Sequence, residues 1–104
     1  MILTVPHHKT RQQAIEILNA APDLFSGVAG PSIEIVDEKR EWTGSRMAFS
    51  FTGKVGFIAV PVSGTIDVDD VNITVMSDLP PMVRTYVGDD KVASGIEKQL
   101  RRLL

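Results

Sequence analysis

The chain has 104 residues, of which 43% are hydrophobic and 23% are charged, and its formal net charge is −2. This length and composition predict one folded domain and exclude a disordered or collagen-like chain. The absence of cysteine excludes disulfides, thiol nucleophiles and thiolate metal ligands, and the slightly negative charge argues against broad nucleic-acid binding.

The N-terminal part is predicted to form a strand followed by a capped helix. Met1–Val5 is a short apolar run typical of a strand. Thr10 is a suitable N-cap, and Gln13 completes a capping-box pattern, so a helix is predicted over Arg11–Ala21. The apolar residues of this helix share one face at 3.6-residue spacing: Ala14, Ile17, Leu18 and Ala21.

A glycine-containing segment separates this helix from the next strand. Leu24–Pro31 is predicted to be a loop. Three of its apolar side chains are expected to be tucked under the sheet: Leu24, Phe25 and Val28. Ser32–Arg40 is predicted to be a strand, and Glu38–Glu41 is predicted to be a charged turn.

The clearest strand pattern lies in Arg46–Thr52, where large apolar and smaller residues alternate with a period of two. Gly53 and Gly56 are expected to interrupt this strand. The large apolar residues of the region are expected to be mostly core: Met47, Phe49, Phe51 and Phe57.

Two more strands are predicted to complete the sheet. Phe57–Val68 is read as one long strand kinked at Pro61, which cannot donate to a ladder and therefore indicates an edge or a bulge. Asp69 and Asp70 are expected to make the turn, and Val71–Val75 to return. The inward set is expected to be Val62, Gly64, Ile66 and Val68, followed by Val71, Ile73 and Val75.

The C-terminal segment is predicted to be helical. A short helix is expected over Met82–Val87, with Gly88 ending it and Asp89 or Asp90 capping a last helix over Lys91–Leu104. The last helix carries one apolar stripe: Val92, Ile96, Leu100 and Leu103.

These elements follow the order β-α-β-β-β-β-α. Strands joined by tight turns pair antiparallel, and helices with one apolar face must cover a sheet. The sequence therefore predicts one α+β domain over residues 1–104, with a single antiparallel sheet and with the N-terminal and long C-terminal helices packed on one face.

The two histidines, His7 and His8, are the first candidates for chemistry. Neighbours on a strand point to opposite faces, so they cannot chelate one metal together. One interpretation has one ring packed near the helix start and the other in solvent. The other has one of them acting as an acid or base in a groove.

A second candidate is the apolar sheet face formed by Met47, Phe49 and Phe51. If these side chains line a groove instead of a filled core, they would suit an acyl chain. The aspartates at positions 67, 69 and 70 are expected to serve turn formation. No nucleophile elbow, phosphate-binding loop, dinucleotide fingerprint or calcium loop occurs in the sequence, so no catalytic residue, metal or cofactor is predicted.

Basic residues form a third candidate surface on the last helix. Lys91, Lys98 and Arg102 share one face at i, i+7 and i+11, and Arg101 is adjacent. The simplest interpretation is a solvated face whose cations suit a helix C-terminus. The alternative is a docking surface for an anionic partner, such as a charged granule or a membrane surface.

Several short motifs resemble the polyhydroxyalkanoic acid system protein family, and the resemblance extends over nearly the whole chain. His7-His8-Lys9 and the Ala14-bearing helix fit the start of that family. The other motifs are Trp42-x-Gly44, Met47-x-Phe49-x-Phe51, Gly56, Val62-Ser63-Gly64-Thr65-Ile66-Asp67-Val68, Leu79-Pro80, Ile96-Glu97, Leu100 and Leu103-Leu104. The resemblance implies a small bacterial protein linked to polyhydroxyalkanoate storage granules, without known catalytic residues.

The sequence thus leads us to expect a non-enzymatic accessory or binding protein of polyhydroxyalkanoate storage, acting at the granule surface or on an acyl ligand. Its expected partners are the granule, granule-associated proteins or a second copy of the chain. The alternatives are a small hydrolase or cyclase acting on a hydroxyacyl ester, with His7 or His8 as base, and an interaction module that dimerises through an exposed strand. With no signal-peptide pattern and no run of about 20 apolar residues, the expected compartment is the cytoplasm.

Overall fold

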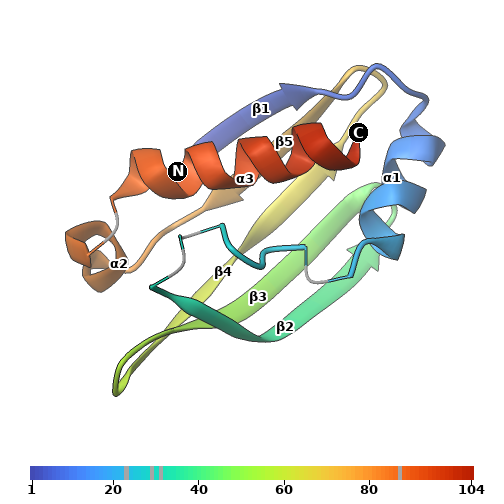
Figure 1. Ribbon diagram of the computed structural model, residues 1–104. Helices are drawn as coiled ribbons and strands as arrows, with labels where there is room; N and C mark the ends of the chain where they lie inside the picture. The colour runs from blue at the N-terminus through green and yellow to red at the C-terminus, as the bar shows by residue number, and fades with distance from the viewer. Residues whose placement is uncertain (23, 29, 31, 87) are drawn as a thin grey trace.

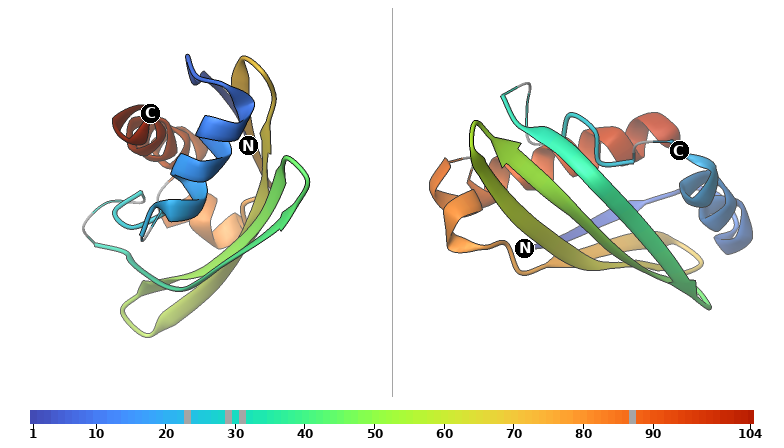
Figure 2. Two further views of the ribbon diagram at one scale, coloured as in Figure 1. Left: turned by 90° about the vertical axis from the view of Figure 1, so that its right-hand side faces the viewer. Right: turned by 90° about the horizontal axis from the view of Figure 1, so that it is seen from below.

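The computed structural model describes residues 1–22, 24–28, 30, 32–86 and 88–104. Its strands form one antiparallel five-stranded sheet in the order β1-β5-β4-β3-β2 (Figure 1). The sheet curves around the helices, which lie on one face (Figure 2), so the predicted α+β architecture is confirmed. The elements are β1 (Ile2–Pro6), α1 (Arg11–Ala20), β2 (Glu34–Thr43), β3 (Arg46–Val55), β4 (Ile58–Val68), β5 (Asn72–Ser77), α2 (Pro81–Tyr86) and α3 (Asp89–Leu103).

The β3–β4 hairpin is longer than the glycines predict. Gly53 does not interrupt β3, because it is paired with Ile35 of β2 and Val60 of β4. The turn comes at Gly56 and Phe57, and Gly56 supplies the positive φ (59°) that a two-residue turn needs at its first position. The expectation that Phe57 is core is wrong, because this turn places its side chain in solvent.

β2 also extends further than predicted. Glu38–Glu41 is not a turn but part of the strand, which continues to Thr43 and pairs with β3 on both sides of a bulge between Val36 and Lys39. Asp37 adopts a positive φ (56°) in this bulge, a conformation that aspartate tolerates better than most residues. Charged residues are accommodated here because β2 is an edge strand.

The predicted edge position of Pro61 is confirmed. Pro61 pairs with Thr52 of β3, but β5 joins β4 only from Gly64 onward, so no described strand pairs with the other side of β4 at Pro61. Ile73 and Val75 are buried as expected. Val71 is exposed instead, with a relative exposure of 63%, because it lies in the β4–β5 turn before β5 begins.

The helices are formed largely as predicted. In α1 the Thr10 hydroxyl accepts the Gln13 N–H and the Gln13 side chain accepts the Thr10 N–H, both at 3.1 Å, which is the predicted capping box. In α3 the N-cap is Gly88, with no side-chain cap, so the prediction of an aspartate cap is wrong. The predicted end of the short helix, Val87, lies outside the described residues.

The apolar stripe of α3 packs onto the sheet as the sequence predicts. Val92, Ile96 and Leu100 are buried, and Leu103 packs against the same cluster. The predicted loop residues lie in this core as well, since Leu24, Phe25 and Val28 are all buried. One core therefore joins α1, the loop and α3 to the inner face of the sheet.

Candidate functional site

The inner face of the sheet is filled by the chain's own aromatic side chains. Met47, Phe49 and Phe51 are all buried in the core cluster. The ring of Phe25, from the loop after α1, lies 4.5 Å from the ring of Phe49 and 5.1 Å from that of Phe51, centroid to centroid. These distances are those of packed aromatic pairs, so the loop occupies the space where an acyl chain would have to lie.

Two shallow surface hollows lie on the opposite, uncovered face of the sheet. They measure about 530 and 560 Å³, and the one beside β4 is lined by Ser50, Thr52 and Pro61 among others. Small and polar side chains dominate this lining, which offers little apolar surface to an acyl chain.

His7 is a buried structural residue, and only 1% of it is exposed. Its Nδ1 accepts the Lys9 backbone N–H at 3.1 Å, and its Nε2 lies 2.8 Å from the carbonyl oxygen of Asp69. Because Nδ1 accepts, Nε2 carries the proton and donates to that carbonyl. Nδ1 therefore holds the β1–α1 connection in shape, and Nε2 ties that connection to the β4–β5 turn.

His8 is exposed and has a positive φ (53°), so the two rings lie in different environments. The interpretation with one packed and one solvated histidine fits this placement. Among the described residues, no group of three or more His, Asp or Glu side chains is arranged to hold a metal ion.

Asp69 organises the turn that His7 contacts. Its carboxylate accepts the backbone N–H of Asn72 at 2.5 Å and that of Val71 at 2.8 Å. These two hydrogen bonds, with that from Asn72 the stronger influence, hold the pKa of Asp69 below its ordinary value. The turn formation predicted for this aspartate is the role it has here.

The lowered pKa of Asp69 predicts an acid-sensitive contribution to stability. The contribution is present above the ordinary pKa of about 4 and is lost as the pH falls through the lower pKa of the folded state. Asp69→Asn keeps an acceptor oxygen but no charge, so we expect it to unfold at a lower temperature than the parent at pH 7, with the difference shrinking toward pH 2. Thermal unfolding at both pH values measures this, and a pH-independent difference would contradict it.

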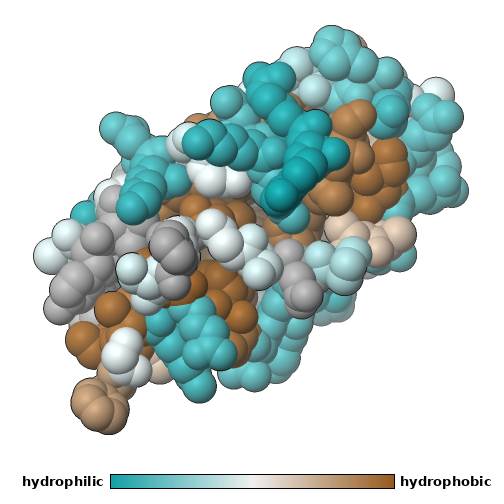
Figure 3. Space-filling model, in the orientation of Figure 1, coloured by the Kyte–Doolittle hydropathy of each residue, from teal (hydrophilic) through white to brown (hydrophobic). Residues whose placement is uncertain are grey.

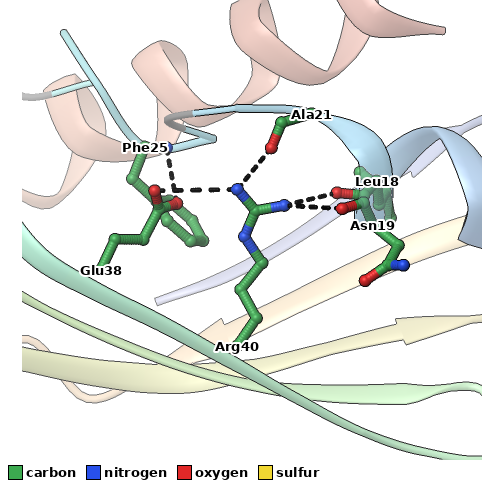
Figure 4. A network of polar contacts seen from close by, with 6 residues as sticks. All are labelled: Leu18, Asn19, Ala21, Phe25, Glu38 and Arg40. Carbon is green, nitrogen blue, oxygen red and sulfur yellow. Dashed lines mark hydrogen bonds and ion pairs between the residues drawn. The ribbon is translucent and has the colours of Figure 1, made fainter.

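A half-buried polar network holds the loop in place (Figure 4). Arg40 of β2 donates to the carbonyl oxygens at the C-terminal end of α1, with Leu18 at 2.8 Å and Ala21 as the closest acceptors. Glu38 accepts the Phe25 N–H at 3.3 Å and lies 3.8 Å from the Arg40 guanidinium. The pair thus fixes both the end of α1 and the start of the segment that carries Phe25.

Sequence reasoning missed this network because it treated residues 38–41 as a turn. A usable signal was present in the alternation of Glu38, Arg40 and Trp42, which places all three on one side of a strand. In the structure Trp42, like Arg40, bonds to α1: its Nε1 donates to the side chain of Asn19 at 3.1 Å.

The basic residues of α3 form an exposed stripe, which we call the α3 stripe: Lys91, Lys98, Arg101 and Arg102. Arg101 lies 3.7 Å from Glu97, one turn earlier, and Arg102 donates to the side chain of Gln99. The apolar side of α3 faces the core, so the stripe faces outward, where hydrophilic side chains cover the helix (Figure 3).

The turn of the β3–β4 hairpin is the most exposed apolar part of the described chain. Phe57 has a relative exposure of 109%, and Ile58 beside it is 36% exposed. In the space-filling view, a hydrophobic protrusion occupies the corner where Figure 1 shows this hairpin ending (Figure 3). We call Phe57 and Ile58 the hairpin tip.

Comparison with known proteins returns no relative. No protein-family model, curated protein or solved structure matches the chain. Among the described residues, no helix is long and apolar enough to cross a membrane. The geometry of the two exposed surfaces, the α3 stripe and the hairpin tip, is therefore the basis for a functional proposal.

Proposed function

We propose that this chain is a non-enzymatic accessory protein that binds the surface of polyhydroxyalkanoate storage granules or proteins on that surface. The sequence resemblance suggests the granule. The placement of the candidate residues supports binding at the protein's exterior, because His7 and the Met47–Phe51 face both serve the interior of the fold.

The observation that carries the proposal is the α3 stripe. The protein as a whole is slightly acidic, yet its long C-terminal helix presents four basic side chains to solvent. The helix is held to the sheet by Val92, Ile96 and Leu100, so the stripe is presented on a rigid element. A rigid row of cations suits an anionic surface, such as a layer of anionic lipid or an acidic protein.

Reversing two charges of the α3 stripe should weaken this binding. We expect Lys98→Glu combined with Arg102→Glu to change the free energy of unfolding by no more than about 0.5 kcal/mol, since both side chains are exposed. Co-sedimentation with isolated granules should fall, and binding of the parent protein should weaken with added salt because exposed charges are screened.

The matched control is Arg11→Glu combined with Lys39→Glu, which makes the same change in net charge on α1 and β2. The control should bind better than the stripe variant. Equal losses would show a non-specific charge effect, and unchanged sedimentation of the stripe variant would remove the stripe from the proposal. Turnover of short 3-hydroxyacyl esters that disappears in His8→Asn would instead favour the hydrolase or cyclase alternative.

A further inference from the structure

The hairpin tip stands apart from the rest of the sheet. β2 begins at Glu34, opposite Lys54, and β5 joins β4 only at Gly64. Residues 55–58 therefore extend past the described pairings of this hairpin with β2 and with β5. The turn does not require a phenylalanine at position 57, because Gly56 supplies the positive φ that the turn needs.

The hairpin that carries the tip is almost free of charge. From Met47 to Ile66 the only charged residue is Lys54, next to the tip, and the residues around Phe57 are apolar or small. The carboxylate nearest by strand register is that of Glu34, opposite Lys54 on β2. An apolar end with a cation at its base is the arrangement by which a protein enters a lipid layer while its charge stays at the headgroups.

The size and shape of the tip favour a lipid layer over a protein partner. Stable protein interfaces bury about 800 Å² on each side, whereas one phenylalanine buries about 150–250 Å² and only Ile58 adds a comparable apolar side chain here. A fluid hydrocarbon layer needs no complementary pocket, because transfer of apolar surface out of water is favourable without directional contacts.

We propose that the β3–β4 hairpin tip inserts Phe57 and Ile58 into the hydrocarbon of a lipid layer. The inference deepens the proposed function and rests on it in one respect. Association with the granule is what would bring the protein to such a layer. Insertion itself does not depend on the α3 stripe. An anchor this small gives weak, reversible binding, so it acts together with other contacts.

Fluorescence of a tip tryptophan tests insertion directly. Phe57→Trp is mixed with phosphatidylcholine vesicles containing brominated acyl chains, which quench tryptophan within the hydrocarbon. Trp42, the only tryptophan of the parent chain, is an internal reference about 30 Å away along the hairpin. We expect quenching and a blue shift for Phe57→Trp and neither for the parent. An unquenched Phe57→Trp would overturn the proposal.

Substitution at the tip tests its contribution to binding. Phe57→Ser should weaken partition into neutral phosphatidylcholine vesicles about tenfold or more. Val71→Ser is the matched control, since Val71 is an exposed aliphatic residue in the turn at the other end of β4, and its partition should be unchanged. Equal loss in both variants, or binding to granule proteins with none to lipid, would overturn the proposal.

The two proposals fail in different ways. The Lys98→Glu and Arg102→Glu variant should keep full partition into neutral vesicles, because that partition depends on the tip and not on charge. No granule binding by the parent protein, with its vesicle insertion intact, would count against the proposed function alone. Intact granule binding by Phe57→Ser, with no vesicle insertion by the parent, would count against the tip alone.

Discussion

Replacing Phe25 by alanine should lower the free energy of unfolding by about 3–5 kcal/mol, the range for a buried phenylalanine. Phe25 lies in the connection between α1 and β2, yet only 1% of it is exposed. Its ring contacts both Phe49 and Phe51, and its N–H is bound by Glu38. The loss is large against the total of about 5–15 kcal/mol that holds a domain of this size.

Urea denaturation of Phe25→Ala measures this loss, and the chain supplies a matched control. Phe57→Ala makes the same chemical change at a residue that is fully exposed, so it should alter the free energy of unfolding by no more than about 0.5 kcal/mol. Similar losses in the two variants would show that the loop does not fill the inner face as described.

Gly95→Ala should destabilise the protein by about 1–3 kcal/mol, although alanine is the better helix former. Helix propensity alone favours alanine by about 0.5–1 kcal/mol. However, a Cβ at position 95 would lie 2.0 Å from the carbonyl oxygen of Val28 and 2.9 Å from its carbonyl carbon. These are backbone atoms, so either α3 or the loop must move, and the cost of overpacking exceeds the gain in propensity.

Ser94→Ala is the control for the sign of the stability change in Gly95→Ala. Ser94 is exposed on the same helix, so only propensity changes, and we expect a gain of a few tenths of a kcal/mol. Thermal unfolding of both variants compares the two effects. A stabilised Gly95→Ala would mean that α3 does not approach the loop backbone closely.

The local features of the fold were predictable because each depends on neighbouring residues. The alternation through Met47, Phe49 and Phe51 identifies a strand, since side chains on a strand change face at every residue. The capping box of Thr10 and Gln13 and the stripe of α3 have the same local origin. Antiparallel pairing then followed from the short turns between strands.

The candidate sites were predictable only as residue types. The sequence left two interpretations of His7 and His8 open, one with a packed and a solvated ring and one with an acid or base in a groove. It could not say that the carbonyl of Asp69 accepts from His7, because these residues are far apart along the chain. It identified the α3 stripe from helical spacing, which is local. Whether the sheet's apolar face was open or filled depended on where Phe25 came to lie.

From its sequence alone, this protein is a single α+β domain with one antiparallel sheet, covering helices and an outward basic stripe, because periodicity and turn chemistry are set by adjacent residues. Only the tertiary structure decided that Arg40 binds the end of α1 and Glu38 the N–H of Phe25, that Gly95 lies against the loop, and that Phe57 is exposed while Phe25 is buried. The physical reason is that burial and hydrogen bonding between distant segments depend on how elements pack, and identical side chains such as these two phenylalanines carry no local mark of that outcome.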